Sequence, residues 1–191
     1  TRKKRTEQFL NDALADPLAR AVLWAGVIDA VRDAERPVGE LFDLVAAALP
    51  VETEVVVVED VLRATRGLVD RYATAETRPA ALELVAQAAD RLLAASEPGG
   101  SRQLAAARGL IGATVETARL QDWLAGTGVP EGLAIDADLR WLILYRLVVL
   151  GRAGAEAIDT EYERDRSATG EQFAARCRAA LHDPAAKEAA W

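Results

Sequence analysis

Apolar residues recur every three or four positions along most of the chain, which is the spacing of one face of an α-helix. The first such stretch covers about 17–33, and its face carries Leu18, Val22, Ala25 and Asp29. It begins at Asp16-Pro17, a pair typical of an N-cap residue followed by proline at the first helical position. Pro37 breaks the pattern, which resumes over 38–49 and ends at Pro50. The sequence therefore predicts two helices in its first fifty residues.

Four consecutive valines at 55–58 are the one place where a strand competes with a helix, since β-branched residues favour strands. The flanks favour the helix. Acidic residues lie on both sides, and the apolar pattern continues to Val69 with no proline and no cluster of turn residues. A single helix over about 53–72 is predicted.

Turn residues divide the next part of the chain. Pro79 opens a helix that ends near Ser96, and a loop of one proline and two glycines follows at 98–100. We expect Ser101 to cap a helix over about 102–115. A shorter helix then carries three apolar residues before Gly126, namely Leu120, Trp123 and Leu124.

A second glycine-rich loop, 126–132, precedes the most apolar helix of the sequence. Asp136 is its expected N-cap, and the helix over 139–150 stops at Gly151. Because this helix is apolar nearly all round, we expect it to be central. Thr169, with Gln172 three residues later, predicts a capping box for a helix through 181, and Asp183-Pro184 repeats the aspartate–proline start.

These elements amount to about nine or ten helices joined by short loops, which make neighbouring helices antiparallel. The predicted fold is all-α, a HEAT- or armadillo-like stack of antiparallel helix pairs forming an α–α superhelix. We expect one helical-repeat domain over 1–191, with a possible internal seam near 97–101. The absence of a sustained heptad argues against a coiled coil.

Composition narrows the choice of partners. The 191 residues carry a net charge of −7, which argues against a nucleic-acid partner. The basic run at 2–5 is interpreted as a solvated end rather than a nucleic-acid or nuclear-import patch. No apolar run reaches the ~18–20 residues of a membrane span, and no signal peptide is recognised. The lack of methionine indicates a processed chain or a piece of a longer one.

Two residues could bear reactive chemistry, and each has a plainer interpretation. Cys177 is the single cysteine, so no disulfide forms within the chain. Arg176 and Arg178 could lower its pKa, but a small buried apolar residue is the better interpretation. His182 with Cys177 would make only an incomplete metal site, so we interpret it as a surface histidine near a helix C-terminus.

Other candidate motifs are incomplete. No serine lies in a G-x-S-x-G elbow, and Ser96, Ser101 and Ser167 all fall at helix boundaries, where capping explains them. Residues 126–128 (GTG) do not continue into a phosphate-binding pattern. Asp136 and Asp138 could bind a divalent metal, but acids at a helix start have an ordinary electrostatic role. No catalytic, cofactor-binding or metal residue is therefore assigned.

Four stretches, in order, resemble segments of bacterial aminopeptidase N, a family of zinc metallo-aminopeptidases. Residues 16–24 (DPLARAVLW) are similar to D-P-L-A-R-A-x-x-W, and 132–141 (GLAIDADLRW) to G-L-x-[IV]-D-x-[DE]-L-R-W. Residues 165–170 (DRSATG) are similar to D-x-[ST]-A-T-G, and 185–191 (AAKEAAW) to A-E-A-K-x-A-A-W. Together they point to the C-terminal helical domain of these enzymes.

The resemblance implies a HEAT-like bowl that covers the active site and shapes the peptide cavity and the access to it. The H-E-x-x-H and G-x-M-x-N motifs of the family are absent here, so no catalytic or metal residue is carried over. We expect this fragment to be no enzyme by itself, with zinc in the catalytic domain of the same cytoplasmic polypeptide. That domain and, in the intact enzyme, peptides are the expected partners, without nucleic acid or membrane. The isolated fragment is expected to self-associate.

Two other hypotheses remain open from the residues alone. The chain could be a free-standing helical-repeat scaffold that binds another protein on a concave face. It could also be an unfamiliar enzyme that uses carboxylates, although no constellation of residues supports one.

Overall fold

The protein is described here from a computed structural model, which describes residues 16–184 and residue 188. Within those residues all regular structure is helical and no strand occurs, which confirms the all-α class. The chain divides into two compact units, Thr1–Thr114 and Val115–Trp191, and each is described separately. None of the described helices is both long enough and apolar enough to cross a membrane.

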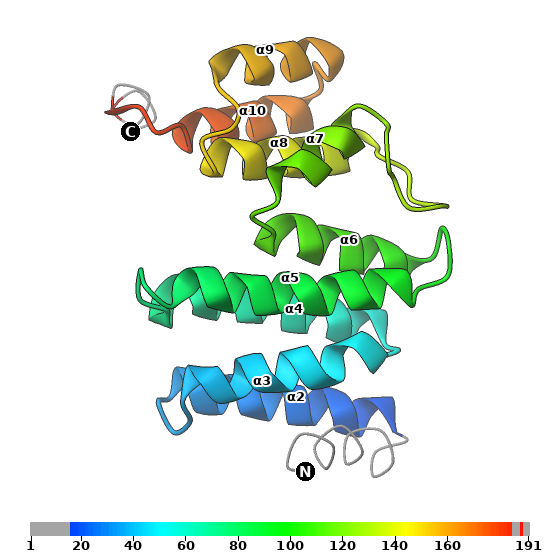
Figure 1. Cartoon of the computed structure of the whole chain (residues 1–191), viewed down its shortest axis with the longest axis vertical. Helices are drawn as coiled ribbons and strands as arrows, with labels where there is room; N and C mark the ends of the chain where they lie inside the picture. Colours follow the sequence, from blue (N-terminus) through cyan, green and yellow to red (C-terminus); the bar gives the residue numbers. More distant parts are fainter. Residues whose placement is uncertain (1–15, 185–187, 189–191) are drawn as a thin grey trace. The chain divides into compact units, whose positions relative to one another are not determined.

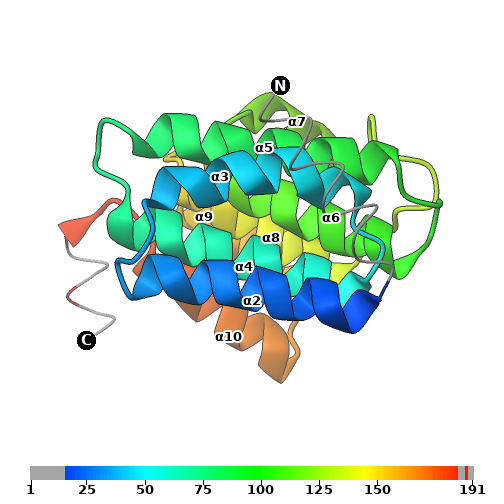
Figure 2. The same cartoon turned by 90° about the horizontal axis from the view of Figure 1, so that it is seen from below.

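From residue 16 onward, the first unit contains five α-helices and a short 3-10 helix, η1. The helices run antiparallel to their neighbours along the chain, with α2 beside α3, α4 beside α5, and α6 following (Figures 1 and 2). This arrangement fits the predicted helix pairs, whereas the superhelical repeat remains a prediction. The elements are α2 (Pro17–Arg32), α3 (Val38–Ala48), η1 (Leu49–Val51), α4 (Val55–Tyr72), α5 (Arg78–Ala94) and α6 (Ser101–Ala113).

The four-valine segment begins α4, as predicted from its flanks. Val57 and Val58 are buried, whereas Val56 is exposed, so the segment contributes one apolar face like the rest of the helix. Gly109 allows α6 to pack closely against α4, because a Cβ there would lie 2.5 Å from Leu62 Cδ1 and that side chain would have to move. Helical periodicity therefore outweighs the strand preference of the individual valines.

The predicted seam at 97–101 lies inside the first unit, between α5 and α6, whereas the division between units follows Thr114. The loop is a tight turn in which Gly99 has a positive φ of 75° and its N–H donates to Gln103 Oε1 at 2.8 Å. It joins two packed neighbouring helices. A prediction about capping is also wrong here, since Gly100 is the N-cap of α6 and Ser101 is its first residue.

The second unit contains α7 (Thr117–Leu124), α8 (Ala137–Val149), α9 (Ala155–Arg164) and α10 (Ala168–Ala179). No residue from 139 to 149 of α8 is exposed, which confirms the central position expected for this helix. Its core cluster joins three helices and includes Trp141, Leu144, Val148, Ile158, Ala174 and Cys177. Trp141 stacks on Phe173 of α10, with ring centroids 6.1 Å apart.

The cap of α10 differs from the prediction. Ser167, not Thr169, is the N-cap, and its hydroxyl accepts a hydrogen bond from Gly170 N at 3.0 Å. Thr169 lies within the first turn. Both residues have the right chemistry for a cap, and the chain enters the helix two residues earlier than the T-x-x-Q pattern indicated.

The predicted glycine-rich loop over 126–132 is confirmed. Gly126, Gly128 and Gly132 have positive φ values of 80°, 64° and 78°. Trp123 Nε1 donates to Gly128 O at 3.1 Å, so the preceding helix fixes the path of the loop.

Candidate functional site

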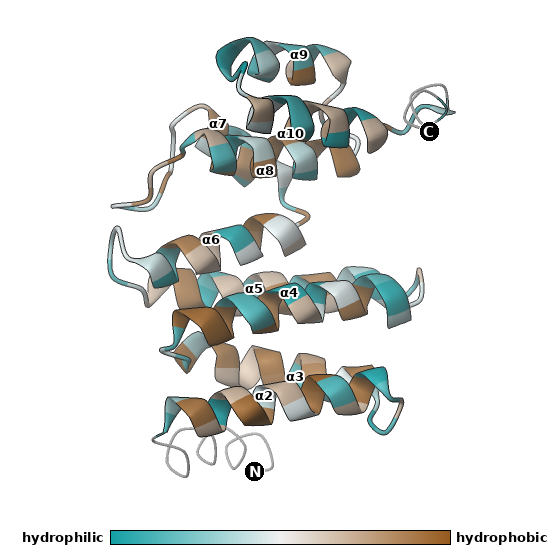
Figure 3. Cartoon of the chain, turned by 180° about the vertical axis from the view of Figure 1, so that it is seen from behind, coloured by the Kyte–Doolittle hydropathy of each residue, from teal (hydrophilic) through white to brown (hydrophobic). Residues whose placement is uncertain are grey.

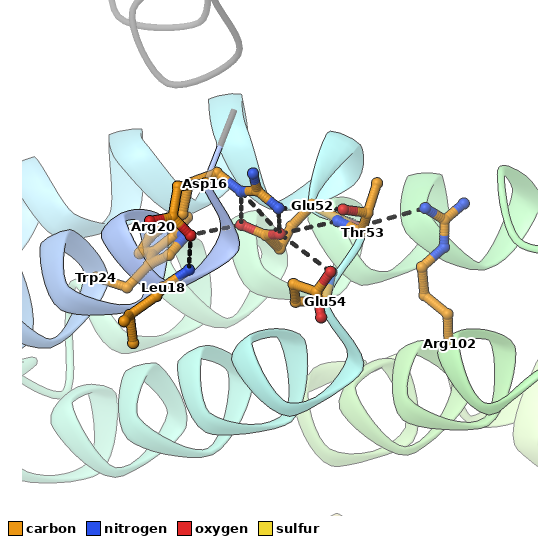
Figure 4. A network of polar contacts seen from close by, with 8 residues as sticks. All are labelled: Asp16, Leu18, Arg20, Trp24, Glu52, Thr53, Glu54 and Arg102. Atoms are coloured by element: carbon orange, nitrogen blue, oxygen red, sulfur yellow. Dashed lines mark hydrogen bonds and ion pairs between the residues drawn. The ribbon is translucent and has the colours of Figure 1, made fainter. Parts of the chain in front are cut away.

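Glu52 is the centre of a buried polar network in the first unit (Figure 4). Arg20 donates from both Nε and Nη2 to its carboxylate, at 3.2 and 3.1 Å. Trp24 Nε1 donates to the same group at 3.4 Å, and the backbone N–H groups of Thr53 and Glu54 donate at 2.9 and 3.1 Å. The network fixes α2 to the segment that leads into α4.

Local sequence explains why these groups meet. Asp16 caps α2 by accepting from Leu18 N at 3.0 Å, which sets the start of the helix. Arg20 and Trp24 follow one and two turns later, so they lie on one face. Glu52 comes directly after η1 and before α4, in extended backbone that leaves the next two N–H groups free to turn toward its carboxylate.

The electrostatic balance keeps Glu52 ionised. Burial by itself would raise the pKa of this carboxyl group, but hydrogen bonds from Arg20, Glu54 N and Thr53 N, with the charge of Arg20, hold the pKa below its ordinary value of 4.5. Because its oxygens already accept from several donors, this carboxylate is not suited to act as a general base.

An open hollow of about 360 Å³ lies beside this network. Arg102 is its cationic side chain, and its guanidinium is already engaged with Ser96 Oγ, Ala95 O and Glu52 O. Arg102 therefore ties the end of α5 to the segment before α4. The hollow is lined by Thr53, Val55, Glu97, Gly100, Ser101 and Arg102. These groups do not form a nucleophile–base pair.

The second unit has a related network built on α8 and α9. Arg140 donates to both carboxylate oxygens of Glu161, at 2.6 and 2.7 Å, and to Leu124 O at 3.1 Å. The hydrogen bond to Glu161 raises the pKa of Arg140, which keeps the pair charged. The indole of Trp141 has a different acceptor, Asp165 Oδ2, at 2.8 Å.

Asp165 also forms the turn that starts α10. Its Oδ1 accepts from Ser167 N at 3.3 Å, and hydrogen bonds from Ser167 and Trp141 hold the pKa of its carboxyl below the ordinary value of 3.8. Gly170 packs directly on this turn. A Cβ at Gly170 would lie 2.0 Å from Asp165 O, so only glycine fits without movement of the backbone.

The two residues singled out for reactive chemistry have the plainer roles predicted for them. Cys177 is buried in the core of the second unit, and burial raises the pKa of its thiol to about 11 despite the charges of Arg176 and Arg178. His182 is exposed, and its Nε2 lies 3.0 Å from Val149 O at the end of α8. His182 therefore contacts the C-terminus of α8.

The remaining candidates are also structural where they are described. Asp136 caps α8 by accepting from Leu139 N at 2.9 Å, and Asp138 lies in the first turn. Ser96 donates to Leu92 O. Across 16–184 and 188, no three histidine, cysteine, aspartate or glutamate side chains gather as metal ligands. The basic run at 2–5 and most of 185–191 lie outside the described residues.

Sequence reasoning missed the two buried glutamates. Glu52 and Glu161 look like members of any acidic helical surface, and nothing local marks their arginine partners, 32 and 21 residues away. A usable signal was the placement of Arg20 one turn from Trp24 and of Arg140 next to Trp141, among mostly apolar residues. A charge in such a place needs a buried partner.

Comparison with known proteins decides the family. A sequence model described as the ERAP1-like C-terminal domain matches residues 3–191, nearly the whole chain. The chain belongs to the family of ERAP1-like C-terminal domains.

A curated relative of this ERAP1-like domain is the aminopeptidase N of Streptomyces lividans. The two are 39% identical over 180 residues, which is 92% of this chain but 21% of the relative. The chain thus spans about a fifth of the length of that protein.

The structure gives a role to the stretches that resemble aminopeptidase N. Those at 16–24, 132–141 and 165–170 contain the arginines and tryptophans of the two networks and several helix-cap residues, whereas Glu52 and Glu161 lie outside them. The residues within the stretches are Asp16, Arg20, Trp24, Asp136, Arg140, Trp141, Asp165, Ser167 and Gly170. In this ERAP1-like domain, the motifs therefore hold helices together.

Proposed function

We propose that this chain is the non-catalytic C-terminal domain of an aminopeptidase N-like zinc peptidase. It covers the active site and shapes both the peptide cavity and the access to it. The observation that carries the proposal is the family match over residues 3–191, supported by 39% identity to an aminopeptidase N of which the chain spans 21%. The zinc, the catalytic residues and a cytoplasmic location belong to the proposed parent polypeptide.

The mechanism is geometric. A rigid helical wall excludes folded proteins and holds peptides near a metal bound elsewhere in the polypeptide, and movement of the wall gates entry and release. The buried networks support this role because they fix neighbouring helices in each unit. Their arginines and carboxylates are occupied by one another rather than available to a substrate.

A chimera tests the proposal. In the Streptomyces lividans aminopeptidase N, the region that matches this chain is replaced by it, and a second variant lacks the region. We expect the chimera to hydrolyse aminoacyl-anilides and short peptides but not the N-terminus of a folded protein. The deletion variant should lose this discrimination, or lose activity on peptides. Identical dependence on peptide length in the two variants would contradict the covering role.

The isolated chain tests the other half of the proposal. We expect no hydrolysis of aminoacyl-anilides and no zinc retained after dialysis. Hydrolysis by the purified chain alone would show that it is catalytic. A chimera carrying Gly170→Ala is the control for misfolding, because that change disturbs the second unit without touching a proposed substrate contact.

A further inference from the structure

The exposed face of α2 is apolar among the described residues. Leu18 is 71% exposed and Val22 is 63% exposed, one helical turn apart. Every exposed position from 17 to 26 holds an apolar residue or glycine, because the one charge in this stretch, Arg20, turns inward to Glu52. The apolar colouring of α2 is visible in Figure 3.

The neighbouring helices of the same unit present charged residues to solvent. They include Asp43 on α3, Arg63 on α4 and Glu83 on α5. In a stack of helices, the terminal helices need a polar outer face to stay soluble. Helix α2 belongs to the end pair of the described helices in the first unit, yet its exposed surface up to residue 26 lacks this polarity (Figure 1). The face therefore has the composition of a surface that is normally covered.

The chain immediately before α2 carries a matching apolar pattern. Residues 6–15 have the sequence TEQFLNDALA, in which Phe9, Leu10, Ala13 and Leu14 fall on one face at helical spacing. The family match begins at residue 3, so this segment belongs to the same domain as α2. Its sequence predicts an amphipathic helix with one face to bury.

We propose that residues 6–14 cover the exposed face of α2 as an antiparallel helix and close this end of the first unit. The segment leads directly into Asp16, the N-cap of α2, so Ala15 and Asp16 supply the two-residue turn that an antiparallel helix pair needs. Nine helical residues span about 14 Å, which matches the roughly 15 Å of α2 between 17 and 26. The inference is independent of the proposed peptidase role.

The short turn also sets the register of the pair. It places Leu14 opposite Leu18 and Leu10 opposite Val22, so the apolar positions of the two helices coincide. The same register directs the basic run at 2–5 toward the C-terminal end of α2, where the helix dipole favours positive charge. Because the segment is tethered beside the face, covering it requires no second molecule.

Hydrogen exchange of the full chain, resolved to short peptides, tests the cover. We expect the amides of 7–14 to be protected in the unchanged chain. Leu18→Lys places a charge on the covered face and should speed their exchange about tenfold or more. Val56→Lys is the matched control, because Val56 is 70% exposed on α4 and its replacement should leave 7–14 unchanged. Leu10→Lys should act like Leu18→Lys while exchange from α3 to α6 stays as it was, which separates uncovering from unfolding.

Cysteine pairs test the register. In a Cys177→Ala background, Leu10→Cys with Val22→Cys should be joined within one chain by a short bis-maleimide. Leu10→Cys with Gln87→Cys is the control, because Gln87 is exposed on α5, whereas α2 packs against α3 and α4.

Four results would overturn the proposal. The first is exchange of 7–14 at the rate of an unstructured peptide, and the second is an equal effect of Leu18→Lys and Val56→Lys on that exchange. The third is an equal yield of cross-link from the two cysteine pairs. The fourth is a cross-link that joins two chains instead of one, since a second copy would then be the occupant of the face.

Discussion

In both units an arginine and a tryptophan of one helix donate hydrogen bonds to carboxylates, but the number of carboxylates differs. In the first, one glutamate receives both the arginine and the tryptophan of α2, together with two backbone N–H groups. In the second, the arginine and tryptophan of α8 are adjacent in sequence and have separate acceptors, Glu161 and Asp165. The spacing explains the difference. Arg20 and Trp24 share one helix face, whereas Arg140 and Trp141 point in different directions.

When several donors share one acceptor, a single substitution removes all of their hydrogen bonds. Loss of Glu52 disconnects four donors at one point, whereas loss of Glu161 leaves the contact between Trp141 and Asp165 in place. In the second unit the tightest packing instead involves the backbone, where Gly170 lies against the turn at Asp165. Single substitutions can therefore break one unit without the other.

The largest expected effect is in the second unit. Gly170→Ala places a Cβ 2.0 Å from Asp165 O, and we expect a loss of about 3 kcal/mol or more in the free energy of unfolding, because backbone must move. Hydrogen exchange should show faster exchange across α9 and α10. Gly154→Ala is the control, with nothing within 4 Å of its Cβ and an expected change below about 1 kcal/mol. Equal effects of the two substitutions would contradict the close approach.

The next largest effect compares the two glutamates directly. Glu52→Gln should lower the free energy of unfolding of the first unit by about 3 kcal/mol, because it removes the buried negative charge that the partly buried Arg20 guanidinium faces at 3.1 Å. Glu161→Gln should cost about 2 kcal/mol, since Arg140 keeps its bond to Leu124 O.

Urea unfolding and unit-resolved hydrogen exchange measure both losses. Asp29→Asn removes an exposed pair with Arg32 and should change stability by less than about 0.5 kcal/mol. The comparison fails if Glu161→Gln proves as costly as Glu52→Gln.

Lowering the pH should weaken the network around Glu52. The pKa of Glu52 is lower in the folded than in the unfolded chain, so its stabilising contribution is present above about 4.5 and is lost as pH falls through the folded value. Stability of the first unit should therefore decrease in acid, and Glu52→Gln should flatten that part of the profile. Urea midpoints from pH 7 to pH 3 measure it. An unchanged acid slope in Glu52→Gln would assign the loss to other groups.

The smallest effect is expected at the hydroxyl of Thr65, which belongs to neither network. Thr65 of α4 is fully buried, and its hydroxyl has no hydrogen-bond partner in the described part of the chain. Thr65→Val removes this unpaired group with little change in shape, so we expect stability to stay equal or rise by up to about 1 kcal/mol. Thermal unfolding measures the shift. A clear loss of stability would mean that the hydroxyl has a partner in solution.

Much of the fold was predictable because its signals are local. Asp16 and Asp136 cap the helices they were expected to cap, and the valines at 55–58 begin a helix as their flanks indicated. The cap of α10 was misplaced because Ser167 and Thr169 are chemically equivalent candidates. Helix α9 carries little sequence signal, since its sequence is mostly polar and only Ile158 and Glu161 are buried.

The candidate site was less predictable because it depends on which helices become neighbours. Periodicity places Arg20 on a face of α2 but does not say that Glu52 will meet it. Likewise, the seam expected at 97–101 rested on a proline and two glycines, which mark a turn whether or not two units separate there. The division after Thr114 carries no such composition signal.

Each of the three tryptophans that the structure describes donates to a different acceptor. Trp24 donates to a carboxylate in the first unit, Trp141 to a carboxylate in the second, and Trp123 to a backbone carbonyl. Indole emission depends on nearby charge and on exposure to water. Variants that retain a single one of these tryptophans would therefore give separate optical signals for the two units. Fluorescence could then follow the unfolding of each unit in the intact chain without an added dye.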